Sequence, residues 1–152
     1  MSTNPITSLQ PILVVEDSAE DFMALSRAFR KHALPNPVVR CIDGDEALEY
    51  LQGLGKHPSW PPTLPAIVLL DLNMPGTDGR DVLDALKHNE QLCSIPVIIF
   101  STSANLRDID DCYRLGANSY VTKPIAYSEL EEKIRLIIGY WLEASELPEV
   151  HQ

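Results

Sequence analysis

Short apolar runs alternate with amphipathic segments along most of the chain. Runs rich in apolar and β-branched residues predict five β-strands, at residues 12–15, 38–41, 67–70, 97–100 and 119–122. Between these runs, apolar residues recur every three or four positions, as they do along one face of an α-helix. The predicted helices span residues 17–32, 45–51, 78–87 and 105–115, and a last one runs from 128 to 141.

Local signals mark the ends of three predicted helices. Asp45 is predicted as the N-cap of the second helix, where a carboxylate can accept a hydrogen bond from a free backbone N–H. The Ser128-Glu-Leu-Glu131 sequence matches a capping box at the start of the last helix. Gly116 follows the fourth helix and is expected to form its C-terminal cap.

Strands that alternate with helices predict an α/β fold in which right-handed crossovers join parallel strands. The strands are apolar almost throughout, which indicates a sheet covered by helices on both faces. We therefore predict a doubly wound, three-layer (βα)5 parallel sheet of the flavodoxin-like kind, with strand order 2-1-3-4-5.

The length of 152 residues fits one domain. We expect a flexible N-terminal arm at 1–8, the domain at 9–143 and a C-terminal tail at 144–152. The proline- and glycine-rich segment 52–65 predicts a surface loop, and Trp60 within it is expected to pack on the domain.

Composition narrows the range of partners. The chain has 12 Lys and Arg against 22 Asp and Glu, a net charge of −10 that argues against nucleic acids and anionic membranes as partners. No apolar run could span a membrane and no signal peptide is visible, so we expect a cytoplasmic protein. Cys41, Cys93 and Cys112 are odd in number and far apart, so we expect small hydrophobic side chains rather than disulfides or zinc ligands.

Polar residues directly follow four of the five predicted strands. These residues are Glu16 and Asp17, Asp71, Ser101 and Thr102, and Lys123. Parallel strands end at the same edge, so we expect these groups to converge there. Clustered carboxylates repel one another unless a cation lies among them, and oxygen ligands suit Mg²⁺. A carboxylate held there can attack phosphorus, while the metal and Lys123 neutralise the transferring phosphoryl group.

The sequence around these positions resembles the four signatures of response-regulator receiver domains. The matching segments are Val-Val-Glu16-Asp17-Ser, Leu-Leu-Asp71-Leu-Asn-Met-Pro75-Gly-Thr-Asp-Gly79, Phe-Ser101-Thr and Val-Thr-Lys123-Pro124. The resemblance extends from about Leu9 to about Gly139. It implies a domain that accepts a phosphoryl group from a histidine kinase and then changes what it binds.

The resemblance also implies which residues form the acceptor and metal site. Asp71 matches the aspartate that accepts the phosphoryl group. Asp17 matches the acid that binds Mg²⁺ directly, and Glu16 matches its neighbour, which usually acts through water. Asn73 matches the position whose backbone carbonyl is a metal ligand.

Further positions match the residues that transmit the signal. Ser101 and Tyr120 match the switch hydroxyl and the switch aromatic residue, and Lys123 matches the lysine of the phosphoryl site. Pro124 matches a proline that often follows a cis bond in the family. Thr102 stands where many receivers have alanine.

Three features resemble one subgroup, the phytochrome-associated, stand-alone response regulators of bacteria. They are the Ser-Thr-Ser103 run, the long 52–65 loop and the Trp-Leu…Leu-Pro tail. This resemblance implies phosphorylation by a bacteriophytochrome-type histidine kinase. Because the chain ends soon after the receiver region, we expect no attached output domain.

Three other functions remain open at this stage. The chain could pass its phosphoryl group on to a histidine phosphotransfer protein. A phosphohydrolase with an aspartyl nucleophile would need a second acid two residues after Asp71, where Asn73 stands. A purely structural pseudo-receiver usually lacks the acceptor aspartate or the lysine, and both are present here. We therefore expect a binding module rather than an enzyme.

We also expect a homodimer built on the fourth helix, the fifth strand and the fifth helix, the face that carries the switch in the family. Trp141, Leu142 and Leu147 lie beyond the predicted end of the sheet and would form an exposed apolar patch. A second copy would bury this patch. Alternatively, the tail folds back on its own domain.

Overall fold

The computed structural model describes residues 10–32, 34–53 and 64–148. One parallel sheet of five strands lies at the centre, in the order β2-β1-β3-β4-β5. The strands are β1 (Ile12–Val15), β2 (Val38–Cys41), β3 (Ile67–Leu70), β4 (Val97–Ser101) and β5 (Ser119–Thr122). The predicted strand order and all five predicted strands are confirmed.

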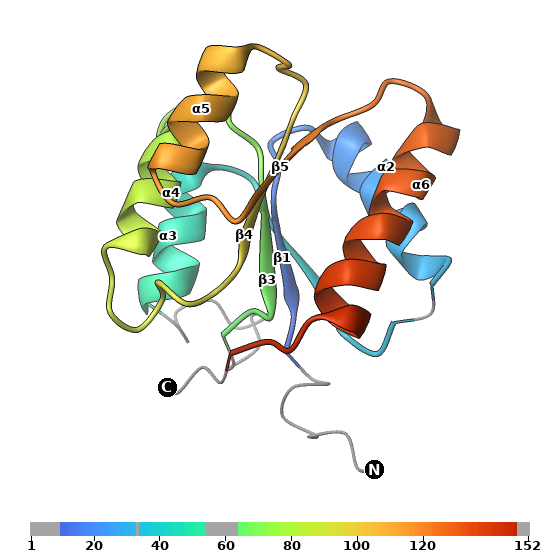
Figure 1. The fold of residues 1–152 in the computed structure, drawn as a ribbon, viewed down its shortest axis with the longest axis horizontal. Coiled ribbons are helices and arrows are strands. Elements are labelled where there is room, and N and C mark those ends of the chain that lie inside the picture. Colours follow the sequence, from blue (N-terminus) through green and yellow to red (C-terminus); the bar gives the residue numbers. More distant parts are fainter. Residues whose placement is uncertain (1–9, 33, 54–63, 149–152) are drawn as a thin grey trace.

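Helices cover both faces of this sheet. They are α2 (Ala19–Arg30), α3 (Gly44–Gly53), α4 (Gly79–Lys87), α5 (Leu106–Arg114) and α6 (Tyr127–Ile137), followed by the π-helical turn η1 (Ile138–Ala144). Figure 1 shows α3, α4 and α5 on one side of the sheet and α2 and α6 on the other. The predicted doubly wound, three-layer α/β architecture is confirmed.

Alternation along each strand divides the apolar side chains between two cores. In β1, Leu13 and Val15 pack beneath α3, α4 and α5, whereas Ile12 and Val14 pack beneath α2 and α6. Successive side chains of a strand point to opposite faces, so an entirely apolar strand fills both cores. All four residues of β1 and of β3 are buried. This rigid centre holds the ends of the strands in place.

The helix-end predictions were only partly correct. Gly116 ends α5 with a φ of 107°, in the left-handed region where glycine is favoured, as expected. Asp45 is not the N-cap of α3, because that helix begins one residue earlier. The Asp43 carboxylate instead accepts a hydrogen bond from the Glu46 N–H at 2.8 Å. The Asp45 carboxylate accepts one from the Thr77 hydroxyl.

The predicted capping box at the start of α6 is also wrong. The helix begins at Tyr127, and its N-cap, Ala126, makes no side-chain hydrogen bond. Glu131 instead forms an ion pair with Lys31, the residue that caps the end of α2. A charged partner on the neighbouring helix has competed successfully with a local backbone donor.

The end of the chain packs on its own domain as far as residue 148, where the described residues end. After α6 the chain continues as η1 and turns back beneath the strands (Figure 1). Trp141, Leu142 and Leu147 are partly buried against the core between the sheet and α2 and α6. The expected exposed patch is therefore wrong, and the alternative of a folded-back tail is correct. The physical reason is that these apolar side chains leave water by packing on the core of their own domain, so their burial needs no second copy.

Some predictions concern residues that the structure leaves undescribed. The N-terminal arm at 1–8 and Trp60 lie outside the described residues. Among the described residues, no helix is long and apolar enough to cross a membrane. The three cysteines are free, with Cys41 and Cys112 buried and Cys93 exposed.

Candidate functional site

Three carboxylates meet at the carboxyl edge of the sheet. Glu16 and Asp17 follow β1, and Asp71 follows β3. Because Val15 pairs with Leu70 in adjacent strands, the residues that come next lie side by side. One carboxylate oxygen from each acid lies within 4.8 Å of the others. Glu16 and Asp71 are only 2% and 8% exposed, whereas Asp17 is at the surface.

Lys123 reaches this cluster from the end of β5. Its ammonium lies 2.5 Å from Glu16, 3.4 Å from Asp21 and 3.5 Å from Asp71. Its backbone N–H donates to the Ser101 carbonyl at 2.7 Å, which ties the end of β5 to the end of β4. One cation therefore contacts two buried carboxylates and one exposed carboxylate.

The peptide bond between Lys123 and Pro124 differs from the family expectation. All peptide bonds of the described residues are trans, so the expectation of a cis bond before Pro124 is wrong. Trans is the lower-energy form of such a bond, and with it the Lys123 ammonium already reaches the acids.

The electrostatics of the cluster favour bound positive charge. Burial alone would lower the pKa of Lys123, but its hydrogen bond to Glu16 and the charges of the surrounding acids raise it above the ordinary lysine value. Burial raises the pKa of Glu16, and the contact with Lys123 offsets that rise only in part. The Lys123 ammonium is therefore charged at neutral pH, and its charge only partly offsets the cost of burying the Glu16 carboxylate. A further cation would stabilise the charged carboxylates.

The donor set fits a hard divalent cation. Glu16, Asp17 and Asp71 offer only oxygen ligands, the kind that Mg²⁺ binds in proteins. Three carboxylates and one ammonium together carry a net negative charge, which a divalent ion would neutralise. Asn73 lies at the same rim, and its N–H donates to an Asp71 carboxylate oxygen at 3.4 Å.

Ser101 and Tyr120, the expected switch residues, are joined through Ser103. The fully buried Ser101 accepts a hydrogen bond at its hydroxyl oxygen from the Ser103 N–H, at 3.2 Å. The Tyr120 hydroxyl donates to the Ser103 carbonyl at 2.8 Å. The backbone N–H of Tyr120 donates to the Tyr113 hydroxyl at 3.1 Å.

Sequence reasoning missed several residues of this region. Asp21, which contacts Lys123, lies four positions after Asp17, so the spacing of helical neighbours could have identified it. Ser103 was noted only as part of a Ser-Thr-Ser run, and its hydrogen bonds had no sequence signal. Nothing in the sequence placed Asp108 beside Ser103.

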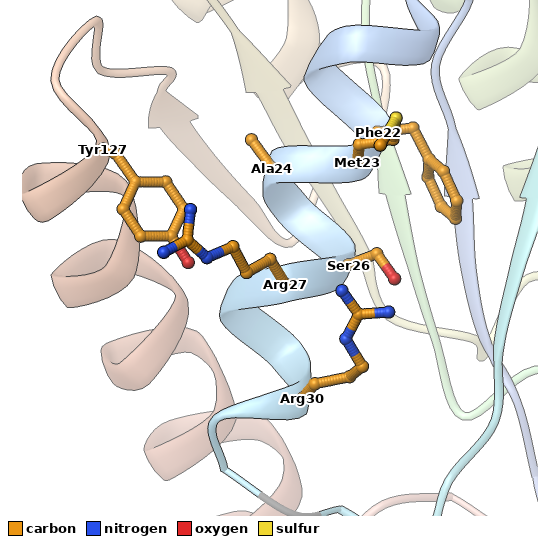
Figure 2. A pocket seen from close by; sticks show the side chains of 7 residues that line it. All are labelled: Phe22, Met23, Ala24, Ser26, Arg27, Arg30 and Tyr127. Carbon is orange, nitrogen blue, oxygen red and sulfur yellow. The ribbon is translucent and has the colours of Figure 1, made fainter.

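A basic hollow lies beside the acidic rim. It has a volume of about 530 Å³ over the outer face of α2, and Figure 2 shows its lining side chains. Arg27 lies over the Tyr127 ring at 4.7 Å, Arg30 lines the hollow further along, and Met23 is 69% exposed. A smaller cavity of about 100 Å³, lined in part by Lys123 and Tyr127, adjoins it. The hollow therefore extends toward the carboxylate cluster.

Arg27 and Arg30 line this hollow, and both are opposite in sign to the net charge of the whole protein. Lys31, which follows Arg30, is paired with Glu131. The chain as a whole has a net charge of −10. This surface is thus suited to contact with an acidic partner.

A doubly wound (βα)5 sheet with three acids and a lysine at its carboxyl edge defines a class of α/β domain with an acidic rim. The chain belongs to the response regulator receiver domain family, whose sequence pattern matches residues 12–135. The resemblance inferred from the four sequence signatures is thereby confirmed.

Similar proteins include relatives from archaea and cyanobacteria. A probable methanogenesis regulatory protein, FilR2 of Methanothrix harundinacea, is 37% identical over 131 residues, which are 86% of this chain and 83% of FilR2. Response regulator Rcp1 of Synechocystis is 36% identical over 137 residues, which are 90% of this chain and 92% of Rcp1.

Solved structures of similar proteins share the fold closely. The crystal structure of the phosphorylated cyanobacterial phytochrome response regulator RcpA superposes with a TM-score of 0.86 at 37% identity, covering 93% of this chain and 99% of RcpA. The Mn²⁺-bound form of Rcp1 gives a TM-score of 0.84 at 35% identity, covering 92% of this chain and 99% of Rcp1. The chain thus resembles phytochrome-linked response regulators along nearly their whole length.

Proposed function

We propose that this protein is a phosphorylation-switched signalling module that accepts a phosphoryl group on Asp71 from a histidine kinase. The observation that carries the proposal is the buried pair of carboxylates, Glu16 and Asp71, contacted by one ammonium, Lys123. Membership of the receiver family supports the same conclusion.

The transfer follows from the groups at the rim. An Asp71 carboxylate oxygen attacks phosphorus, the bond between phosphorus and the donor imidazole nitrogen breaks, and its electron pair stays on the imidazole. The Lys123 ammonium, already beside Asp71, donates to a phosphoryl oxygen as negative charge gathers there. The Ser101 hydroxyl, at the end of the adjoining strand β4, would bind a second oxygen.

The carboxylates would also hold the metal ion that this chemistry needs. Glu16, Asp17 and Asp71 supply carboxylate oxygens, and Asn73 supplies its backbone carbonyl. Bound Mg²⁺ would neutralise charge on the phosphoryl oxygens. The Mn²⁺-bound form of Rcp1 supports a divalent ion in a protein of this kind.

A kinase of the phytochrome type is the proposed phosphodonor. RcpA, a phytochrome response regulator, resembles the chain over 93% of its length. The basic hollow on α2 adjoins the rim and suits an acidic docking surface, so a donor bound there would lie close to Asp71. FilR2 is about as similar in sequence, and its name concerns methanogenesis rather than light sensing. Phosphorylation by a phytochrome-type kinase therefore has to be tested directly.

The proposed output is altered binding by the face formed from α5, β5 and α6, in the cytoplasm. Leu136 and Tyr140 on this face are 52% and 59% exposed, which supports a homodimer contact there in place of the tail. A full-length monomer in sedimentation at tens of micromolar, both with and without phosphodonor, would refute the dimer.

A phosphohydrolase is disfavoured because Asn73 stands where such enzymes need an acid.

Intact mass after incubation with Mg²⁺ and acetyl phosphate tests the proposal. The wild type should gain one phosphoryl group, and Asp71→Asn, which keeps the shape but lacks the nucleophile, should gain none. Asp81→Asn, a matched change at an exposed carboxylate of α4, should be labelled like the wild type. Labelling of Asp71→Asn, or steady turnover of a phosphomonoester, would contradict the proposed function.

A further inference from the structure

Arg40 is a charged residue on a strand face where apolar side chains are expected. Val39 and Cys41 contact the core beneath α3, α4 and α5, and Val38 contacts the opposite core beneath α2 and α6. Because side chains alternate along a strand, Arg40 lies on the same face of β2 as Val38. Its guanidinium lies over the ring of Phe22 in α2, 5.4 Å from the ring centre. Packing alone does not account for an arginine at this position.

The guanidinium of Arg40 binds the backbone that carries two of the rim acids. Its Nε donates to the Glu16 carbonyl at 3.0 Å, and one of its terminal nitrogens donates to the Asp17 carbonyl, also at 3.0 Å. Among the described residues, no backbone N–H donates to either of these carbonyls. A guanidinium can bind both because it is planar and presents several N–H donors in a fixed fork. Arg40 therefore orients two successive peptide groups.

The donor itself is firmly held. In the register of β1 and β2, Arg40 lies opposite Val14, and the next residue of β2, Cys41, accepts the Glu16 N–H at 3.0 Å. Stacking on Phe22 holds the guanidinium against the first turn of α2. The two hydrogen bonds thus run from a braced side chain to the short segment between β1 and α2, and they limit how that segment can turn.

The two peptide groups that Arg40 binds lie on either side of the Asp17 Cα atom. A peptide group is planar, so fixing both planes fixes the two backbone torsions between them and the direction in which the side chain leaves the backbone. The Glu16 carboxylate has other contacts, with Lys123 and with the Ser18 N–H at 3.1 Å. Within the described part of the chain, the Asp17 carboxylate has no hydrogen-bond or ion-pair partner. Its direction therefore depends on the backbone.

We propose that Arg40 is a positioning residue for the metal site, which holds the Asp17 carboxylate within reach of the other two acids by orienting the peptide groups on both sides of it. The inference rests on the proposed function, in which the three acids bind Mg²⁺, and adds a residue that is not itself a ligand. The arrangement has an electrostatic cost, since the guanidinium brings positive charge close to a cation site. The benefit in geometry outweighs this repulsion.

Three roles for Arg40 predict different results. If it acts only through its charge, removing the charge tightens Mg²⁺ binding, and a lysine in its place changes nothing. If it only stabilises the fold, its loss lowers the melting temperature and leaves the affinity of the folded protein for Mg²⁺ unchanged. If it positions Asp17, both changes weaken Mg²⁺ binding, because neither new side chain presents the guanidinium fork.

Calorimetric titration of the full chain with magnesium chloride, and separately with calcium chloride, at constant ionic strength distinguishes these roles. Arg40→Lys should bind Mg²⁺ about ten-fold more weakly than the wild type, although the charge is kept. Arg40→Gln should also bind Mg²⁺ more weakly, although it removes a repelling charge. Mg²⁺ demands near-octahedral ligands whereas Ca²⁺ tolerates irregular sites, so the loss of Ca²⁺ affinity should be smaller. Arg114→Gln, which removes an exposed arginine of α5, is the matched control and should bind both ions like the wild type.

The titrations are made below the melting transition of each variant, so that only folded protein is compared. Wild-type Mg²⁺ affinity in Arg40→Lys, tighter Mg²⁺ binding by Arg40→Gln, or equal losses for the two ions would each overturn the inference. Arg40→Lys keeps a long cationic side chain on an outer strand of the sheet, and it carries the test if Arg40→Gln fails to fold. Failure of the wild type to bind Mg²⁺ would instead contradict the metal site of the proposed function, and the role of Arg40 with it.

Discussion

Replacing Lys123 with methionine tests whether a single cation holds the buried acids together. Lys123→Met keeps a long unbranched side chain and removes only the charge. The ammonium it removes lies 2.5 Å from Glu16 and 3.5 Å from Asp71. The side chains of Lys123, Glu16 and Asp71 are 9%, 2% and 10% exposed, so water cannot readily replace the lost partner.

The expected cost comes from the buried charge left behind. Removing one partner of a buried ion pair typically costs about 3–5 kcal/mol, because the other charge then lacks a counter-ion. Asp17 and Asp21 at the rim are exposed, so water reaches part of the cluster. We therefore expect a loss near the lower end, about 3 kcal/mol in the free energy of unfolding at neutral pH. In a domain of this size that corresponds to roughly 6–12 °C in melting temperature.

The cost should depend on pH in a defined direction. Burial raises the pKa of Glu16, and the variant lacks the Lys123 contact that partly offsets this rise. A folded-state pKa above the unfolded value means that the folded variant takes up a proton first as the pH falls. The loss of stability should therefore be smaller at about pH 5 than at about pH 7.5. Mg²⁺ should also reduce the loss, since it returns positive charge to the folded cluster.

Urea unfolding followed by circular dichroism measures these differences, at both pH values and with or without Mg²⁺. Lys133→Met, which removes a lysine of α6 outside the cluster, should stay within about 0.5 kcal/mol of the wild type. Equal stability of Lys123→Met and the wild type at neutral pH without Mg²⁺ would refute the reasoning. A loss that grows toward acid would refute the assignment of the cost to Glu16.

Three further predictions concern the metal, the partner and the thiols. Asp17→Asn should weaken Mg²⁺ binding at least about ten-fold in a titration, since it removes a charged ligand, and unchanged affinity would exclude Asp17 as a ligand. Arg27→Glu/Arg30→Glu should slow phosphorylation by the cognate kinase about ten-fold but leave labelling by acetyl phosphate intact; equal slowing of both reactions would argue against docking at the hollow. Iodoacetamide should modify the exposed Cys93 and spare Cys41, because burial raises the pKa of the Cys41 thiol. Replacing all three cysteines with alanine should leave phosphorylation unchanged, and its loss would reveal a thiol function.

The sequence by itself determined the architecture and the composition of the rim. A strand buried on both faces must be apolar along its length, so uninterrupted apolar runs such as Ile67–Leu70 identified the strands. The acids and Lys123 directly follow strands, so knowing where a strand ends was enough to place them at one edge. This is a local property of the chain combined with the rule that parallel strands end on the same side.

Only the tertiary structure decided how side chains far apart in sequence are paired. Glu131 matched a local capping pattern, but Lys31 on the neighbouring helix is its partner. The position of Trp141 beyond the predicted end of the sheet suggested an exposed side chain, but this side chain is partly buried against the core. The contacts of Asp108 with Ser103 and Arg80 join α5 to the loop after β4 and to the first turn of α4, and these segments meet because both helices lie on the same side of the sheet. Each of these pairings follows from competition among all the groups within reach of a side chain. Those groups come within reach only once the helices have packed on the sheet.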